Sequence, residues 1–138
     1  MNKSPIFISA TMFLVLLLGA SCGNKKGTTN AGHLRSAIEF EDTIHHFGTI
    51  YRENPIDSFD FKFKNTGNKL VVILGANTSC KCTTVKHGFE PIKPGETSYI
   101  RVIYDGTGRQ PEYFSKSAII YTSASDELIK LTIDGKLQ

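Results

Sequence analysis

The sequence predicts an all-β fold for residues 37–138, organised as a single antiparallel β-sandwich. From residue 37 onward, apolar and polar side chains alternate with a period of two, as they do in strands with one buried face. Turn-forming residues recur at intervals of about ten, which is typical of a sheet built from short antiparallel strands. Because no part of this region has the 3.6-residue period of an amphipathic helix, we expect two facing sheets.

The first half of this domain supplies four expected strands. In the clearest of them, Phe59, Phe61 and Phe63 point to one face, and charged side chains occupy the positions between them. A turn sequence at residues 65–68 (Asn-Thr-Gly-Asn) leads into a β-branched run that is typical of a strand buried on both sides. We expect the two strands that flank this turn to pair as a hairpin. The four expected strands are Ala37–Glu41, His46–Ile50, Ile56–Lys64 and Lys69–Ala76.

The second half begins with a turn of defined type. In residues 93–96 (Lys-Pro-Gly-Glu), proline takes the second position and glycine the third, as the φ angles of a type II turn require. The strands expected after this turn are Thr97–Asp105, Tyr113–Thr122 and Glu127–Leu137. Their expected inward residues are Ile100, Val102 and Tyr104 in the first of them, and Ile129, Leu131 and Ile133 in the last.

About seven strands in roughly a hundred residues is the scale of an immunoglobulin-like sandwich. The sequence has no Trp, and Cys80 and Cys82 are too close together in the chain to bridge two sheets. These two facts exclude an ordinary antibody-type domain.

The first 21 residues match a secretory signal peptide. Lys3 is followed by an apolar run from Ile6 to Leu18 and then by three small residues. The run is well short of the roughly 20 residues that a membrane-spanning helix needs. We therefore expect residues 1–21 to direct export and then to be removed.

Cys22 directly follows the small residues. Residues 18–22 (Leu-Gly-Ala-Ser-Cys) resemble the lipobox of bacterial lipoproteins, although Gly19 stands where that motif usually has Leu. The resemblance implies a mature chain that begins at Cys22, whose thiol and amine carry acyl chains, and two or more such chains anchor a protein firmly. We expect lipidation at Cys22 and a place in the bacterial cell envelope, facing the periplasm on the outer membrane. Two alternatives stay open: ordinary secretion after cleavage at Ala20 or Ser21, and a retained helix with an incidental cysteine.

Residues 22–36 are expected to form a flexible tether between the anchor and the sandwich. They are rich in Gly, Asn and Thr, and they bury too little apolar surface to offset the entropy lost on ordering. The net charge of the chain is +3, and it falls to +2 when Lys3 leaves with the signal peptide. No basic stripe with interleaved aromatic residues is present, so the sequence gives nucleic-acid binding no support.

The order of several motifs resembles the family named for the domain of unknown function DUF1573. The motifs stand at residues 46–50 (His-Phe-Gly-Thr-Ile), 61–67 (Phe-Lys-Phe-Lys-Asn-Thr-Gly), 79–83 (Ser-Cys-Lys-Cys-Thr) and 91–96 (Pro-Ile-Lys-Pro-Gly-Glu), and the resemblance continues to residues 131–135. It implies an exported, often lipid-anchored protein with an immunoglobulin-like sandwich, and it implies no established activity. The family usually has Gly between the two cysteines, where this chain has Lys81.

Cys80 and Cys82 are the residues best suited to chemistry. Side chains two apart on a strand share a face, so both sulfurs could hold one soft metal ion. A disulfide between them requires the backbone to bend, because extended residues place their Cα atoms near the upper limit for a bridge. Three interpretations stay open: a disulfide, which an oxidising compartment favours; packing without chemistry; and a copper(I) site with His87 as a third ligand. The nearer interpretation of His87 is a residue in an exposed loop.

Motifs for hydrolysis and phosphate binding are absent from the sequence. It contains no Gly-x-Ser-x-Gly elbow, no His-Glu-x-x-His pair and no phosphate-cradling loop. We therefore expect a non-enzymatic protein without a cofactor, which contacts the membrane through its acyl anchor and presents a surface or sheet edge to a protein partner. The alternative is a thiol-redox or copper(I)-handling protein that uses Cys80 and Cys82.

Overall fold

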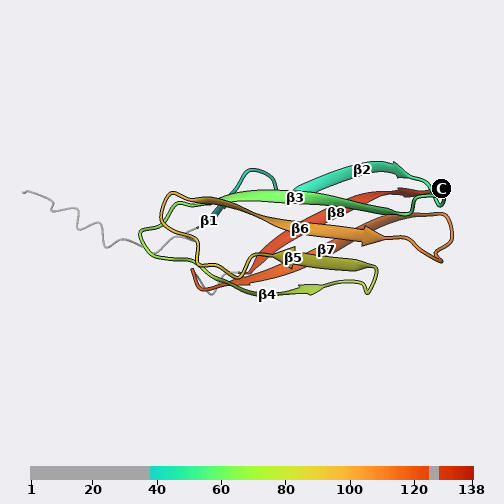
Figure 1. Ribbon diagram of the computed structural model, residues 1–138. Helices are drawn as coiled ribbons and strands as arrows, with labels where there is room; N and C mark the ends of the chain where they lie inside the picture. Colours follow the sequence, from blue (N-terminus) through green and yellow to red (C-terminus); the bar gives the residue numbers. More distant parts are fainter. Residues whose placement is uncertain (1–37, 125–127) are drawn as a thin grey trace, which may run out of the picture. The chain divides into compact units, whose positions relative to one another are not determined.

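The computed structural model describes residues 38–124 and 128–138 (Figure 1). The expected signal peptide, the tether and Cys22 lie outside these residues. Within them the chain forms eight β-strands and no helix, so none of the described residues belongs to a helix that could cross a membrane. The strands are β1 (Ile38–Phe40), β2 (Ile44–Ile50), β3 (Ile56–Asn65), β4 (Ile73–Thr78), β5 (Thr83–His87), β6 (Thr97–Asp105), β7 (Glu112–Thr122) and β8 (Ile129–Leu137).

The strands form two four-stranded sheets. The first sheet has the order β1-β3-β6-β5, and the second has the order β2-β8-β7-β4. All neighbours are antiparallel except β2 and β8, which run parallel with a register shift between His46 and Thr49. The prediction of an all-β sandwich is confirmed, and the parallel pair is a feature that the sequence pattern did not predict.

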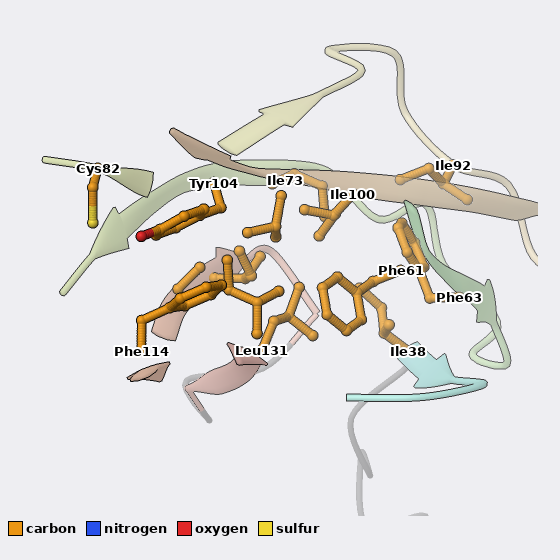
Figure 2. Close-up of a cluster of buried hydrophobic side chains, with 14 of the residues drawn as sticks. Ile38, Phe61, Phe63, Ile73, Cys82, Ile92, Ile100, Tyr104, Phe114 and Leu131 are labelled. Atoms are coloured by element: carbon orange, nitrogen blue, oxygen red, sulfur yellow. The ribbon is translucent and has the colours of Figure 1, made fainter. Parts of the chain in front are cut away.

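The core lies between the two sheets (Figure 2). Phe61, Ile100 and Ile120 are completely buried there, and Tyr104 stacks on Phe114 with ring centroids 3.8 Å apart. The inward positions predicted for β6 are all buried, as are Leu131 and Ile133 of β8, whereas Ile129 is only partly covered. Alternation therefore predicted the buried face of β6 correctly, and that of β8 except at Ile129.

Two predictions about the chain after residue 65 are wrong. The strands on either side of the turn at 65–68 do not form a hairpin, because β3 belongs to the first sheet and β4 to the second. The run at 69–76 is also not buried on both sides: Val71 and Ile73 are buried, whereas Leu70 and Leu74 are exposed. The run crosses to the edge of the second sheet, where only one of its faces is covered.

Asn65 explains why the chain leaves the first sheet at this point. Its buried side-chain amide donates to the carbonyl oxygens of Lys69 and Ile92 at 2.8 and 2.9 Å, and its side-chain oxygen accepts from the Gly67 amide at 3.0 Å. These bonds tie the turn after β3 to the Val71–Ile92 bridge, whose Ile92 carbonyl also accepts from the Val71 amide. The turn at 93–96 packs beside them, with Gly95 at a φ of 81°, as the type II prediction required.

Strand β5 was absent from the expected set. Val85 is its only large aliphatic side chain and is merely half-buried, so the segment lacks a clear apolar alternation. The strand is defined instead by its pairing with β6, which runs from Thr83 opposite Tyr104 to His87 opposite Ile100.

Candidate functional site

One side of the sandwich carries two free sheet edges. Strand β4 is the last strand of the second sheet and β5 the last strand of the first, and the two lie next to each other (Figure 1). An edge strand turns a row of backbone N–H and C=O groups away from its own sheet. We call this region the β4–β5 side: strands β4 and β5, the connecting turn at 79–82, and the exposed residues Leu74 and Phe89.

Leu74 and Phe89 are large apolar side chains without cover. Leu74 is 66% exposed and Phe89 84% exposed. They lie at the same end of the β4–β5 side, because a backbone bridge joins Val71 to Ile92 just beyond them. The ring of Phe89 contacts only the edge of the partly buried His87 ring among the described aromatic residues.

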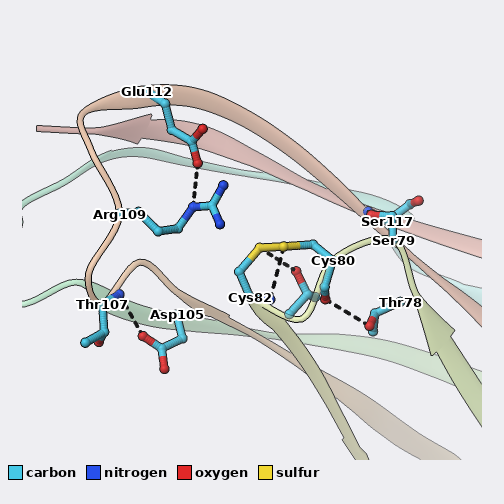
Figure 3. Close-up of a disulfide and its surroundings, with 10 residues drawn as sticks. Thr78, Ser79, Cys80, Cys82, Asp105, Thr107, Arg109, Glu112 and Ser117 are labelled. Carbon is cyan, nitrogen blue, oxygen red and sulfur yellow. Dashed lines mark hydrogen bonds and ion pairs between the residues drawn. A yellow bond between two sulfur atoms is a disulfide. The ribbon is translucent and has the colours of Figure 1, made fainter.

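At the opposite end of this side, the chain crosses between sheets in a tight turn that contains both cysteines. The Thr83 amide donates to the Cys80 carbonyl oxygen at 3.1 Å, so residues 80–83 form a hydrogen-bonded β-turn. Cys80 and Cys82 are joined by a disulfide within this turn (Figure 3), and their Cα atoms are 5.1 Å apart. That separation is in the ordinary range for a bridge, because the turn supplies the backbone bend that an extended strand lacks.

The turn is tied to both sheets. Ser79 exchanges two hydrogen bonds with Ser117 of β7, since the Ser79 amide donates to the Ser117 carbonyl and the Ser117 amide donates to Ser79 Oγ, each at 2.9 Å. On the other side, the Asp105 amide at the end of β6 donates to the Cys82 carbonyl at 2.9 Å. The disulfide therefore lies on a crossing that is held in place from both layers.

The two sulfur-bearing residues differ in their surroundings. Cys82 is only 9% exposed and belongs to the core, whereas Cys80 is partly exposed. The Cys82 amide donates to Cys80 Sγ at 3.0 Å, and Lys81 between them is exposed to solvent. Cys80 is thus the more exposed residue of the bridge and Cys82 the more buried one.

A buried hydroxyl lies at the Cys82 end of the core. Tyr104 faces Thr83 across the β5–β6 ladder, and Figure 2 shows its oxygen at the same end of the core as the Cys82 sulfur. Among the described residues no group accepts a hydrogen bond from this hydroxyl, while the Arg109 guanidinium interacts with its oxygen. Burial raises the pKa of Tyr104, and Glu112 raises it further, while Arg109 opposes the rise. Because an Arg side chain can only donate, the O–H group of Tyr104 is still available as a donor.

Arg109 and Glu112 close this end of the sandwich. Arg109 Nε donates to Glu112 Oε1 at 2.6 Å, and Figure 3 shows the Arg109 side chain extending toward the disulfide. The guanidinium lowers the pKa of the Glu112 carboxyl through this hydrogen bond. A positive and a negative group thus flank the region of the disulfide and the Tyr104 hydroxyl.

The disulfide contributes little to the stability of the fold. It joins residues only two apart in the sequence, so the loop it closes is minimal. The chain-entropy model gives about 1.5 kcal/mol for such a loop, against about 4.7 kcal/mol for a 100-residue loop. The same turn is already held by backbone hydrogen bonds, so stability alone is a weak reason for this bridge.

His87 is not brought to the two cysteines. It ends β5, four residues beyond Thr83, which corresponds to about 13 Å of extended strand. Its Nδ1 is 2.8 Å from the carbonyl oxygen of Gly88. Among residues 38–124 and 128–138, no group of three His, Cys, Asp or Glu side chains is arranged to hold a metal ion.

His45 and His46 lie on opposite faces of β2, as adjacent strand residues must. The His45 ring stacks on Phe59 at 3.7 Å between centroids, and burial lowers the pKa of His45. His46 instead pairs with Asp134 at 2.7 Å on the outer face of the second sheet. The two imidazoles therefore serve different contacts and form no common site.

Comparison with known proteins supports the fold and gives no activity. The family model described as "Protein of unknown function (DUF1573)" matches residues 38–137, which is almost all of the expected domain. No curated protein matches the sequence.

Solved structures with the same arrangement come from several sources. A protein of unknown function from Porphyromonas gingivalis W83 is 18% identical with a TM-score of 0.61, covering 78% of this chain and 51% of its own length. The PapD-like domain 7 of human CEP192 is 9% identical with a TM-score of 0.54, covering 76% of this chain and 87% of that one. The CupB2 chaperone of Pseudomonas aeruginosa is 9% identical with a TM-score of 0.50, covering 72% and 55%. This chain therefore spans about half the length of the P. gingivalis protein, and these likenesses establish the fold alone.

Proposed function

This chain belongs to the DUF1573 family of proteins of unknown function, and we propose that it is a lipid-anchored envelope protein whose β4–β5 side binds an extended segment of a protein partner. The observation that carries the proposal is the combination, on one side of the sandwich, of two free sheet edges with exposed Leu74 and Phe89. The role is binding rather than catalysis.

Strand addition is the binding mode that fits this side. A free edge offers a row of backbone donors and acceptors, and an extended peptide can pair with them while its side chains contact exposed apolar groups. Leu74 and Phe89 supply those apolar contacts at one end of β4 and β5. The chaperone among the fold neighbours is consistent with a binding role for this architecture.

The charge of β5 favours a particular kind of segment. Lys86 on β5 and Lys81 in the preceding turn are both exposed, and β5 itself has no acidic side chain. A lysine on an edge strand opposes pairing with a second copy of the same edge through like-charge repulsion. We therefore propose a partner segment that alternates apolar with acidic residues.

Photo-crosslinking tests the binding surface directly. A photoreactive amino acid is placed at Leu74 in the full chain, in the cells that produce it, and at Ile56 as the matched control. Ile56 is 52% exposed but lies on β3, in the interior of the first sheet. We expect a discrete adduct from position 74 that disappears when Phe89→Lys is added, and none from position 56. Equal labelling from both positions would contradict the proposed surface.

The proposed anchor is supported by the signal-peptide pattern and by residues 18–22. Intact mass of the protein extracted from membranes tests it. We expect a chain that begins at Cys22 and carries added acyl mass, and Cys22→Ser should shift the protein out of the membrane fraction. A mature chain that begins elsewhere would contradict the anchor without affecting the proposed binding surface.

A further inference from the structure

We propose that Cys80 and Cys82 form a thiol–disulfide exchange site, in which the thiolate of a partner dithiol attacks Cys80 Sγ and Cys82 leaves as the thiolate. This activity goes beyond the binding role of the β4–β5 side and does not depend on it. Two features of the described residues assign the direction of attack: the difference in exposure between the two cysteines, and the Tyr104 hydroxyl at the Cys82 end of the core.

Access decides which sulfur is attacked. Exchange proceeds by approach of a thiolate to one sulfur of the bridge, so the attacked atom must be open to solvent. Both cysteines contact the core, but Cys80 is partly exposed in the turn, whereas Cys82 is only 9% exposed. Lys81 places a positive charge between the two residues at the surface, which favours the approach of an anionic attacker.

The groups around Cys82 suit a leaving thiolate. A thiolate is stabilised by hydrogen-bond donors and nearby cations. The Tyr104 hydroxyl lies at the Cys82 end of the core (Figure 2), and no described residue accepts a hydrogen bond from it. It interacts with Arg109 and Glu112, which pair with each other at 2.6 Å. Tyr104 is thus a positioning residue that can donate to the Cys82 thiolate once the bridge opens.

The second half of the exchange releases Cys80. After the first attack, Cys80 Sγ is bonded to the partner's sulfur; the partner's second thiolate then attacks that sulfur and displaces Cys80 as a thiolate. The Cys82 amide, which donates to Cys80 Sγ at 3.0 Å, stabilises the charge that develops there. Two electrons pass from the partner to this chain, so the partner ends with one new disulfide and this chain with two thiols.

The sequence itself makes the site of attack measurable, because trypsin cuts after Lys81 and separates the two cysteines. The full chain in detergent is treated with limiting reduced glutathione, quenched with acid, alkylated with iodoacetamide and digested. We expect glutathione on the peptide that ends at Lys81 and the alkyl group on the peptide that begins at Cys82.

Two results would overturn the proposal in different ways. Glutathione on the Cys82 peptide, or equally on both peptides, would overturn the assignment of the attacked sulfur. A bridge that stays closed at glutathione concentrations that open an unfolded control of the same chain would overturn the exchange activity.

Single-cysteine variants provide a matched pair. The variant Cys82→Ser keeps Cys80, and Cys80→Ser keeps Cys82; each is treated with oxidised glutathione, and the adduct is followed on its own peptide, so Cys22 does not contribute. We expect the retained Cys80 to react about ten-fold faster or more, because it is accessible and carries the amide hydrogen bond. Equal rates would overturn the assignment.

The role of Tyr104 is tested in the protein with the intact bridge. Tyr104→Phe should slow the opening of the bridge by reduced glutathione several-fold, and an unchanged rate would remove Tyr104 from the mechanism.

Discussion

The β3–β6 pair and the β4–β5 side have opposite characters. Strands β3 and β6 pair over nine consecutive positions without a break, in the interior of one sheet, and their inward side chains are almost completely buried. Strands β4 and β5 belong to different sheets, are joined by a disulfide turn, and leave large apolar side chains exposed. The contrast indicates that the buried contacts of this chain are concentrated in the middle of the sheets, whereas the β4–β5 side combines free sheet edges, exposed Leu74 and Phe89, and the disulfide.

The largest loss of stability should come from truncating a buried side chain of the core. Phe61→Ala removes a ring that is 0% exposed, and we expect the free energy of unfolding to fall by about 3–5 kcal/mol. Phe89→Ala removes the same ring at a site that is 84% exposed, and it should change stability by less than about 0.5 kcal/mol. Urea unfolding followed by circular dichroism measures both. Similar losses of stability in the two variants would show that Phe89 is buried in solution, and the difference between the core and the β4–β5 side would disappear.

An intermediate loss of stability is expected from substituting Asn65, where the chain leaves β3 and crosses toward β4. Asn65→Ala leaves the Lys69 and Ile92 carbonyls and the Gly67 amide without their side-chain partner. The loss should be about 1–3 kcal/mol, because three hydrogen bonds of a buried side chain are lost, although the Ile92 carbonyl keeps its bond to the Val71 amide. Asn68→Ala, at an exposed position in the same turn, is the control and should cost less than about 0.5 kcal/mol. A mild Asn65→Ala variant would mean that water replaces these bonds.

The smallest expected effect is a pH-dependent change in stability from an ion pair on the outer face of β3 and β6. Arg101 Nε and Nη2 donate to the two carboxylate oxygens of Asp60 at 2.6 and 2.7 Å, and these hydrogen bonds lower the pKa of Asp60. A carboxyl group with a lower pKa in the folded state stabilises the protein above its unfolded pKa of about 3.9, and this contribution is lost as the pH falls through the folded pKa. Because the pair is well exposed, the contribution is small.

The same pair can be isolated by combining substitutions. Asp60→Asn and Arg101→Gln should each weaken the fall in stability below about pH 4, and the double variant should add nothing further. Unfolding curves at several pH values measure this. Additive losses would show that Asp60 and Arg101 act independently.

The sequence predicted the interior far better than the edge. The alternation around Phe61 and Ile100 is strong because each strand there has a neighbour on both sides and one covered face, so the pattern and the fold agree. The run at 69–76 misled the prediction because Leu70 and Leu74 are as apolar as core residues although they are exposed. Strand β5 has little apolar signal, since backbone pairing to β6 defines it.

The candidate site was predicted only in part. The spacing of Cys80 and Cys82 identified them and indicated that a bridge needs a bent backbone, but it left the choice among disulfide, packing and metal open. Tyr104 was predicted as a core residue, and nothing in its sequence context marks its hydroxyl as an available donor; that depends on the ladder that places Thr83 opposite it. Arg109 and Glu112 are three residues apart and form an ion pair that the sequence analysis did not predict.

The position of β8 has a consequence for how the chain folds. The last strand of the sequence is an interior strand of the second sheet, where it separates β2 from β7, and its parallel pairing with β2 joins residues more than eighty positions apart. Such contacts have high contact order, and they form slowly because a long loop must close first. The second sheet cannot be completed until β8 has been synthesised and has paired with both β2 and β7. Until β8 is in place, β2 has no neighbour in its sheet, because among the described strands it pairs with β8 alone.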